Sequence, residues 1–223
     1  MKKTKTQACA TLMLLFISVS AFAQQRAVSY DLDRLVTEHR LSVYNREASP
    51  LNDQGQKGLK LSAKYNDGVA WINDLNFTNG IIELDVRGKN VPQESFLGVA
   101  FHGVDEKTLD AVYFRPFNFH AVDSVQQIHM VQYVSHPLYP WNVLREKFNA
   151  QYEKRISSPP NPDAWFHVRI EIRYPQVLVF VNNQTSPCLS VKQLNNRQSG
   201  KLGLWVGNGS DGSFANLKVT FFN

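Results

Sequence analysis

Hydrophobic and polar residues alternate most regularly between positions 165 and 173. The apolar positions are Phe166, Val168, Ile170 and Ile172, and the polar positions between them are His167, Arg169, Glu171 and Arg173. A period of two directs successive side chains to opposite faces of a strand. The pattern therefore predicts a strand with its apolar face in the core and its charged face in water.

Similar alternation, or a short apolar run bounded by turn residues, recurs along the chain. It predicts further strands over residues 81–87, 95–102, 109–115, 125–134, 177–181, 186–191, 201–206 and 214–222. Gly, Asn and Pro separate many of these segments, and no alternation of strands with helices is present. About a dozen short strands of this kind indicate an all-β sandwich or barrel in one domain.

Residues 135–163 interrupt this series with a long connection. Trp141, Leu144, Phe148 and Tyr152 follow one another at helical spacing, and prolines lie near both ends. The spacing predicts one short helix, with Trp141, Leu144 and Phe148 directed inward across one end or face of the sandwich. Connections of this length are usually functional or disordered, and the aromatic content argues against disorder. Two roles stay open, a packed flap and a segment that contacts a ligand.

The first 23 residues have a pattern typical of an export signal. A positive segment at 1–5 precedes an apolar stretch at 8–22, and Ala21-Phe22-Ala23 provides small residues for cleavage. We expect a signal peptide over residues 1–23, a mature domain over 24–223, and a periplasmic or secreted protein. The apolar stretch is too short for a stable membrane span, and none is expected later in the chain.

Charge narrows the choice of partners. The chain carries 24 Lys and Arg against 19 Asp and Glu, and three of the basic residues, Lys2, Lys3 and Lys5, belong to the leader. The remaining surface is nearly balanced, which argues against a nucleic-acid partner. Cys188 is the single cysteine after the leader, so no internal disulfide is expected.

Four segments carry a resemblance to a known superfamily. They are residues 80–87, 96–102, 112–119 and 200–208, the last followed by 214–217. Over residues 57–222 the chain resembles the concanavalin A-like lectin/glucanase superfamily, and more narrowly exported bacterial proteins near the 3-keto-disaccharide hydrolase-like and laminin-G-like domains. The resemblance implies a jelly-roll sandwich of two curved antiparallel sheets, with one short helix in the long connection. It implies no single activity, because this fold hosts lectins, hydrolases, lyases and interaction modules.

Catalytic candidates come from two partial motif matches. Retaining glucanases of the superfamily carry Glu-x-Asp-x-x-Glu on one strand, with two acids about 5 Å apart. Glu83 and Asp85 match the first two positions, but Gly88 stands at the third, and Arg87 beside them would keep both acids ionised. A solvated strand face is the alternative role for this pair. Gln127-Ile128-His129 matches the Gln-x-His element of jelly-roll alginate lyases, but residues 201–205 contain no tyrosine. The catalytic candidates are Glu83, Asp85, His129 and Glu146.

A recognition surface is the remaining possibility. Sugar sites commonly combine aromatic faces with planar polar groups that bond to hydroxyls. Candidates of these two kinds, on neighbouring predicted strands or in the long connection, are Tyr113, Arg115, Asn118, His129, Gln132, His136, Trp141 and Arg145. Arg115 also has a structural alternative, an ion pair with Asp85 or Glu146 that would order the flap.

The sequence offers little for a metal ion. No pair of histidines has helical metal spacing. Residues 208–212, Asn-Gly-Ser-Asp-Gly, are rich in oxygen donors, so Asn208 and Asp211 are calcium candidates. A turn between two strands is the more common role of such a segment. Apart from calcium, no cofactor is expected.

Two functions follow from these residues. The first is an exported carbohydrate-binding or interaction module without a complete catalytic set, whose partner is a glycan or polysaccharide. The alternative is a glycoside hydrolase, acting on a modified disaccharide or polysaccharide through carboxylates in the concave groove. Three carboxylates converging on one groove would favour the hydrolase, and an aromatic groove without them would favour binding. Whether the chain is an enzyme is left open at this point.

Overall fold

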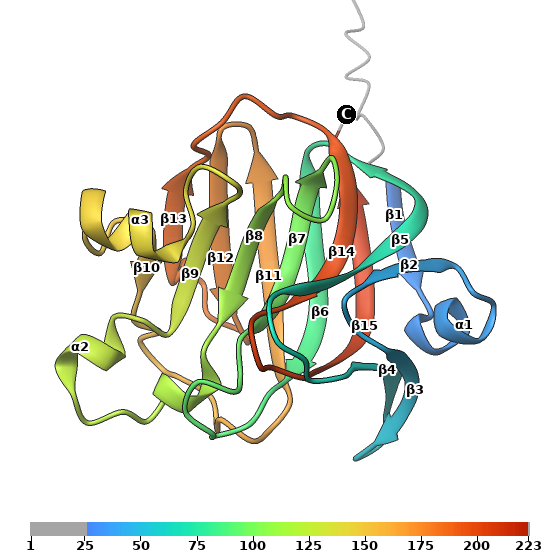
Figure 1. Ribbon diagram of the computed structural model, residues 1–223, viewed down its shortest axis with the longest axis horizontal. Coiled ribbons are helices and arrows are strands. Elements are labelled where there is room, and N and C mark those ends of the chain that lie inside the picture. Colours follow the sequence, from blue (N-terminus) through green and yellow to red (C-terminus); the bar gives the residue numbers. More distant parts are fainter. Residues whose placement is uncertain (1–25, 223) are drawn as a thin grey trace, which may run out of the picture.

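The computed structural model describes residues 26–222 and consists of two antiparallel sheets that lie one over the other (Figure 1). The predicted signal peptide lies outside the described residues. The architecture is the expected all-β sandwich, and no helix in the described part is both long and apolar enough to span a membrane.

One sheet has eight strands. Across the sheet they are β13 (Leu189–Lys192), β12 (Gln176–Val181), β11 (Phe166–Arg173), β6 (Gly80–Arg87), β15 (Gly212–Phe221), β4 (Gln56–Leu61) and β3 (Ala48–Asp53). The eighth strand, β1 (Arg26–Tyr30), pairs with the end of β15 beyond the part that β4 occupies.

The other sheet has seven strands. In order they are β10 (Glu153–Lys154), β9 (Val131–Ser135), β8 (Asp110–Phe114), β7 (Leu97–Gly103), β14 (Gly200–Val206), β5 (Gly68–Phe77) and β2 (Leu41–Tyr44). The helical elements are α1 (Leu32–Thr37), a 3-10 turn (Pro116–Asn118), α2 (Ser124–Gln127) and α3 (Trp141–Lys147). In Figure 1, α3 lies beside β10 and β9 at one end of the sandwich, and α1 lies at the other end.

The core lies between the two sheets and follows the alternating pattern. In β11, Phe166, Val168, Ile170 and Ile172 are buried, while His167, Arg169 and Glu171 are half-buried on the outer face. In the neighbouring β6 the same face is buried, because Ile170 pairs with the equally buried Ile82. The predicted register of both strands is confirmed.

The seven-stranded sheet is buried on both of its faces at its centre. Every residue of β7, β8 and β9 is buried. Val112 and Phe114 belong to the core between the sheets, whereas Tyr113, between them, belongs to a second apolar cluster on the outer face, together with Leu144 of α3. The long connection therefore covers part of this outer face.

Three expectations about local structure were incomplete or wrong. Residues 125–134 were expected to form one strand, but the Asp123 carboxylate accepts a bond from the backbone N–H of Gln126 at 2.9 Å and starts α2, so the strand begins at Val131. The connection contains the expected helix, and also the two-residue strand β10. Trp141 was expected to point inward with Leu144, but it is 51% exposed. It is the first residue of a helix of only two turns, and Leu144 is the residue that this helix buries.

Candidate ligand-binding site

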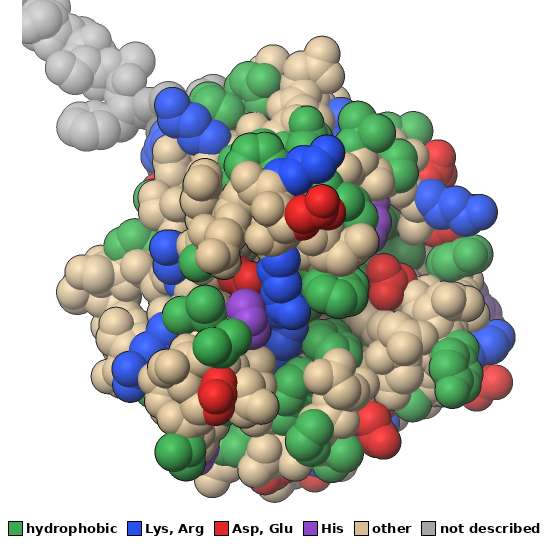
Figure 2. All heavy atoms as spheres, turned by 60° about the vertical axis from the view of Figure 1, so that its left-hand side comes forward, with side chains coloured by type: hydrophobic (Ala, Val, Ile, Leu, Met, Phe, Trp, Pro, Cys, Tyr) green, Lys and Arg blue, Asp and Glu red, His purple; other side chains and the backbone are tan. Residues whose placement is uncertain are grey.

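A pocket of about 420 Å³ lies over the outer face of the seven-stranded sheet. Figure 2 shows this side of the molecule, where basic, acidic and histidine side chains gather beside hydrophobic ones around a hollow. Seven of the eight predicted ligand-binding residues line the pocket: Tyr113, Arg115, Asn118, His129, His136, Trp141 and Arg145. The eighth, Gln132, is fully buried beneath it and holds Arg115 and Tyr113.

Aromatic rings form one wall of the pocket. The ring centroids of Tyr113 and Trp205 are 5.0 Å apart, and Phe96 packs edge-on against both Tyr113 and Phe117. Trp205 faces the pocket because Leu204 and Val206, its neighbours in β14, face the core. Gly207 allows the loop of Phe96 to close on this wall, since a Cβ at Gly207 would lie 2.7 Å from the Cβ of Phe96.

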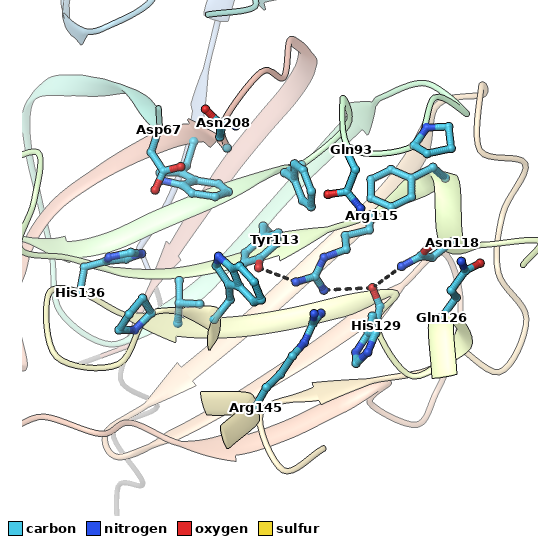
Figure 3. A pocket seen from close by; sticks show the side chains of 18 residues that line it. Asp67, Gln93, Tyr113, Arg115, Asn118, Gln126, His129, His136, Arg145 and Asn208 are labelled. Carbon is cyan, nitrogen blue, oxygen red and sulfur yellow. Dashed lines mark hydrogen bonds between the residues drawn. The ribbon is translucent and has the colours of Figure 1, made fainter. Parts of the chain in front are cut away.

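Arg115 lies at the floor of the pocket and is held on several sides. Its Nη1 donates to the carbonyl of His129 at 3.0 Å, and its Nη2 donates to the hydroxyl of Tyr113 at 2.7 Å and to Oε1 of Gln132. Asn118 donates to the same His129 carbonyl at 3.1 Å (Figure 3). With 5% of its side chain exposed, Arg115 is a fixed part of the floor.

The acid beside Arg115 is Glu153 of β10. Its carboxylate accepts bonds from Nε and Nη2 of Arg145, both at 3.1 Å, and Nη1 of Arg115 lies 3.7 Å away. Nδ1 of His129 lies 2.7 Å from the same carboxylate. The prediction that Asp85 or Glu146 would pair with Arg115 was wrong. Pairing of β10 with β9 places Glu153 opposite Gln132. A strand of two residues is too short to show a period of alternation, so this pairing could not be predicted from the sequence.

The opposite end of the pocket contains Asp67, Asn208 and His136 (Figure 3). Burial raises the pKa of the Asp67 carboxyl above its ordinary value and lowers the pKa of His136 below its ordinary value. Burial also lowers the pKa of His129 at the first end. The pocket is therefore polarised, with arginines at one end and a carboxyl group at the other.

The other catalytic candidates lie elsewhere. Glu83 and Asp85 are on the outer face of the eight-stranded sheet, and Glu146 is exposed on α3 outside the pocket. Asp85 contacts Nδ1 of His167 at 2.9 Å and Nδ2 of Asn216 at 2.6 Å. Arg87, which was expected beside the acids, pairs with Asp53. The structure therefore does not bring these carboxylates together with His129, and Asp67 is the one acid among the residues that line the pocket.

The two calcium candidates point to different surroundings. The carboxylate of Asp211 is engaged by Lys60 at 3.1 Å and by Lys89 at 3.2 Å, whereas Asn208 lines the pocket and accepts a bond from the backbone N–H of Asn66. Two lysines on one carboxylate leave it poorly suited to a cation. Within residues 26–222, no group of three His, Cys, Asp or Glu side chains is arranged to hold a metal ion.

Sequence reasoning missed several residues of the pocket. They are Asp67, Pro92, Gln93, Phe96, Phe117, Gln126, Val134, Pro140 and Gly207. Asn208 was considered only as a calcium ligand. Trp205 alternates with Leu204 and Val206 in the sequence, which left a groove and the edge of the core as its two possible places. Phe96 and Phe117 lie in the segments that carry the family resemblance, so their aromatic character was a usable signal. Asp67 precedes a glycine in a turn, and such a position has no feature that separates it from an ordinary turn.

Comparison with known proteins shows the fold. No protein-family model and no curated protein matches the chain. Solved structures do match: the carbohydrate-binding module CBM66 from Bacillus subtilis has a TM-score of 0.59 at 12% identity, over 80% of this chain and 94% of that one.

Two further solved structures extend the similarity. The exoplasmic/lumenal domain of VIP36 bound to Ca²⁺ and Man3GlcNAc gives a TM-score of 0.52 at 10% identity, over 82% of this chain and 83% of that one. A proposed glycosyl hydrolase from Parabacteroides distasonis gives 0.51 at 14% identity, over 83% and 89%. The chain thus shares the jelly-roll fold of these solved structures, which is the fold that the resemblance to the concanavalin A-like superfamily implied. The narrower resemblance to 3-keto-disaccharide hydrolase-like and laminin-G-like domains stays a prediction.

Proposed function

We propose that the chain is an exported protein that binds a carbohydrate in the pocket over the seven-stranded sheet. The observation that carries this proposal is the combination of an aromatic wall, made by Tyr113, Trp205 and Phe96, with planar polar side chains around it. Pockets of this size that combine aromatic and apolar walls with convergent polar groups are typical of small-molecule sites. The similar folds of a carbohydrate-binding module and of the VIP36 domain in its Ca²⁺/Man3GlcNAc-bound form support the proposal.

Trp141 provides the test of this proposal. Its ring is half exposed at the rim, and Cζ of Arg145 lies 5.0 Å from the ring centroid, which orients the two side chains. Because the exposed Trp141 ring lines the pocket, Trp141→Ala is expected to weaken glycan binding about tenfold, or about 1.4 kcal/mol. The ring also contributes little to the core. The unfolding free energy of the variant should change by less than about 1 kcal/mol, well below the cost of losing a buried tryptophan.

The experiment is a glycan-array screen of the chain from residue 24, followed by calorimetric titration of the glycans that bind. The matched control is Tyr65→Ala, which removes an aromatic ring that is 82% exposed and outside the pocket. The control should bind as the parent does. Unchanged binding by Trp141→Ala together with a loss of several kcal/mol in stability would make Trp141 an anchor of the connection and would reject its role in binding.

Glycoside hydrolysis is the second candidate function, and one observation favours it. Asp67 lines the pocket with a pKa raised by burial, as a proton donor requires, and His136 is nearby. Against it, the usual mechanisms need two carboxyl groups on either side of the bond that breaks. Glu153, the next acid, is 2% exposed and bonded to Arg145. Product analysis with each bound glycan decides between the functions, since binding alone releases no reducing sugar.

A further inference from the structure

The charges around Glu153 define which sugar the pocket would accept, given that the proposed function holds. We infer that the ligand is an acidic sugar whose carboxylate lies against Arg145, at the end of the pocket that also contains Arg115 and His129. Three observations carry this inference: the charge balance of the cluster, the unused donors of Arg145, and the polarity of the whole pocket.

The cluster of charged side chains formed by Arg115, Arg145 and Glu153 contains more positive than negative charge. Two guanidinium groups, Arg115 at 5% and Arg145 at 32% side-chain exposure, surround the single carboxylate of Glu153. On α3 the exposed Glu146 and Lys147 offset each other. An unbalanced charge in a partly dehydrated pocket is costly unless a counter-charge pairs with it. A bound anion would supply that counter-charge.

Arg145 has donors left for such an anion. Its Nε and Nη2 bond to Glu153, and within the part of the chain that the structure describes its Nη1 has no hydrogen-bond partner. Arg115, in contrast, uses both terminal nitrogens on Tyr113, Gln132 and the His129 carbonyl. Figure 3 shows Arg145 reaching toward Arg115 from the opposite wall. A planar guanidinium edge facing a pocket is well matched to a carboxylate.

The polarity of the pocket orients the sugar. Asp67 and Asn208 lie at the far end, where their side-chain oxygens can bond to hydroxyl groups but offer no counter-charge to a carboxylate. The ligand is therefore directed with its carboxylate toward Arg145 and its hydroxyls toward Asp67 and Asn208. The chemical class that fits is a uronic acid unit of an acidic glycan. A sulfate ester shares the anionic charge, and the experiment must distinguish the two sources.

The test is calorimetric titration with three series of oligosaccharides, built from galacturonate, glucuronate or mannuronate, each beside its carboxyl-reduced neutral form. The parent chain should bind at least one acidic series about tenfold more tightly than the reduced form. Arg145→Gln should abolish this preference, because it should weaken binding of the acidic series about tenfold more than it weakens binding of the reduced form. Lys147→Gln removes a neighbouring exposed charge on α3 as the matched control, and it should keep the preference. Thermal unfolding of each variant verifies that it is folded.

Each other outcome overturns a defined part of the argument. Equal binding of acidic and reduced forms would reject the acidic ligand and leave carbohydrate binding standing. A sulfated galactan bound in preference to every uronate, with the same loss in Arg145→Gln, would reject the carboxylate and retain an anion. Loss of the preference in Lys147→Gln as well would reject Arg145 as its specific origin. Absence of binding to any sugar, acidic or neutral, would reject the proposed function itself.

Discussion

Both outer faces of the sandwich carry arginine, histidine and carboxylate side chains, but the two faces use them differently. On the eight-stranded sheet, His167 contacts Asp85 at 2.9 Å and Arg169 donates to Glu171 at 3.0 Å, and all four side chains keep between 18% and 38% of their surface exposed. On the seven-stranded sheet, Glu153 keeps 2%. The long connection makes the difference, because it covers one face and leaves the other open.

This difference decides which charges can form a site. Pairs on an open strand face are screened by water and contribute little to stability. Under a cover, the same residue types must satisfy one another, and any surplus charge or donor is available to a ligand. The histidines follow the same division: bonding to Asp85 raises the pKa of His167, whereas burial lowers the pKa of His129.

The largest loss of unfolding free energy is expected from Arg115→Met. The change leaves Glu153 with one arginine fewer and removes the donors to Tyr113, Gln132 and the His129 carbonyl. Breaking a buried ionic network of this kind costs about 3–5 kcal/mol. Arg173→Met, the control on the open face, loses a side chain that is 60% exposed and should cost less than about 1 kcal/mol. Chemical denaturation of both variants measures the two costs, and equal costs would remove the distinction between the faces.

A second comparison separates the two sides of one strand. Ile170 of β11 is fully buried in the core, and Glu171 beside it faces outward between Arg169 and Arg173. Ile170→Ala should cost about 2–5 kcal/mol, as large-to-small changes in a core do. Glu171→Ala should stay within about 0.5 kcal/mol, the usual range for surface changes. Similar melting losses in the two variants would contradict the register of β11 against β6.

The strands that alternation could predict are those with one face in the core. β6 and β11 have this pattern, and their bounds and facing were predicted from sequence. Strand β3 is exposed or half-buried throughout, so neither its residues nor their order distinguishes it from a loop. The prediction of one strand over residues 125–134 was wrong for another reason. The N-terminal cap at Asp123 starts a helix where the apolar residues had suggested a strand.

The site was predictable where it is built from neighbouring strands. Tyr113 and Arg115 share a face of one strand segment, and periodicity alone identifies that face. The position of Glu153 depends on the pairing of β10 with β9, and the position of Asp67 depends on the pairing of β5 with β14, which places Gly68 opposite Val206. Such contacts between remote segments have no local periodicity, and the sequence accordingly suggested the wrong acid for Arg115.

The smallest expected effect is in how stability depends on pH, where His167 and His129 should contribute in opposite directions. The folded pKa of His167 is raised, so its stabilisation is complete below its ordinary pKa of about 6.5 and is lost as the pH rises through the folded value. The folded pKa of His129 is lowered, so folding favours its neutral form, and stability is lost as the pH falls below about 6.5. Because His167 is 38% exposed, its share is screened to less than about 1 kcal/mol.

Unfolding free energies of His167→Gln and His129→Gln, measured between about pH 5 and pH 8 and subtracted from those of the parent, isolate the two histidines. Subtraction is needed because burial also lowers the pKa of His102 and His136, which adds a background loss of stability in acid. The parent should exceed His167→Gln mainly on the acidic side, and its advantage over His129→Gln should shrink there. If the two differences changed with pH in the same direction, both histidines would experience the same surroundings, and the contrast between the covered and open faces would then not extend to their electrostatics.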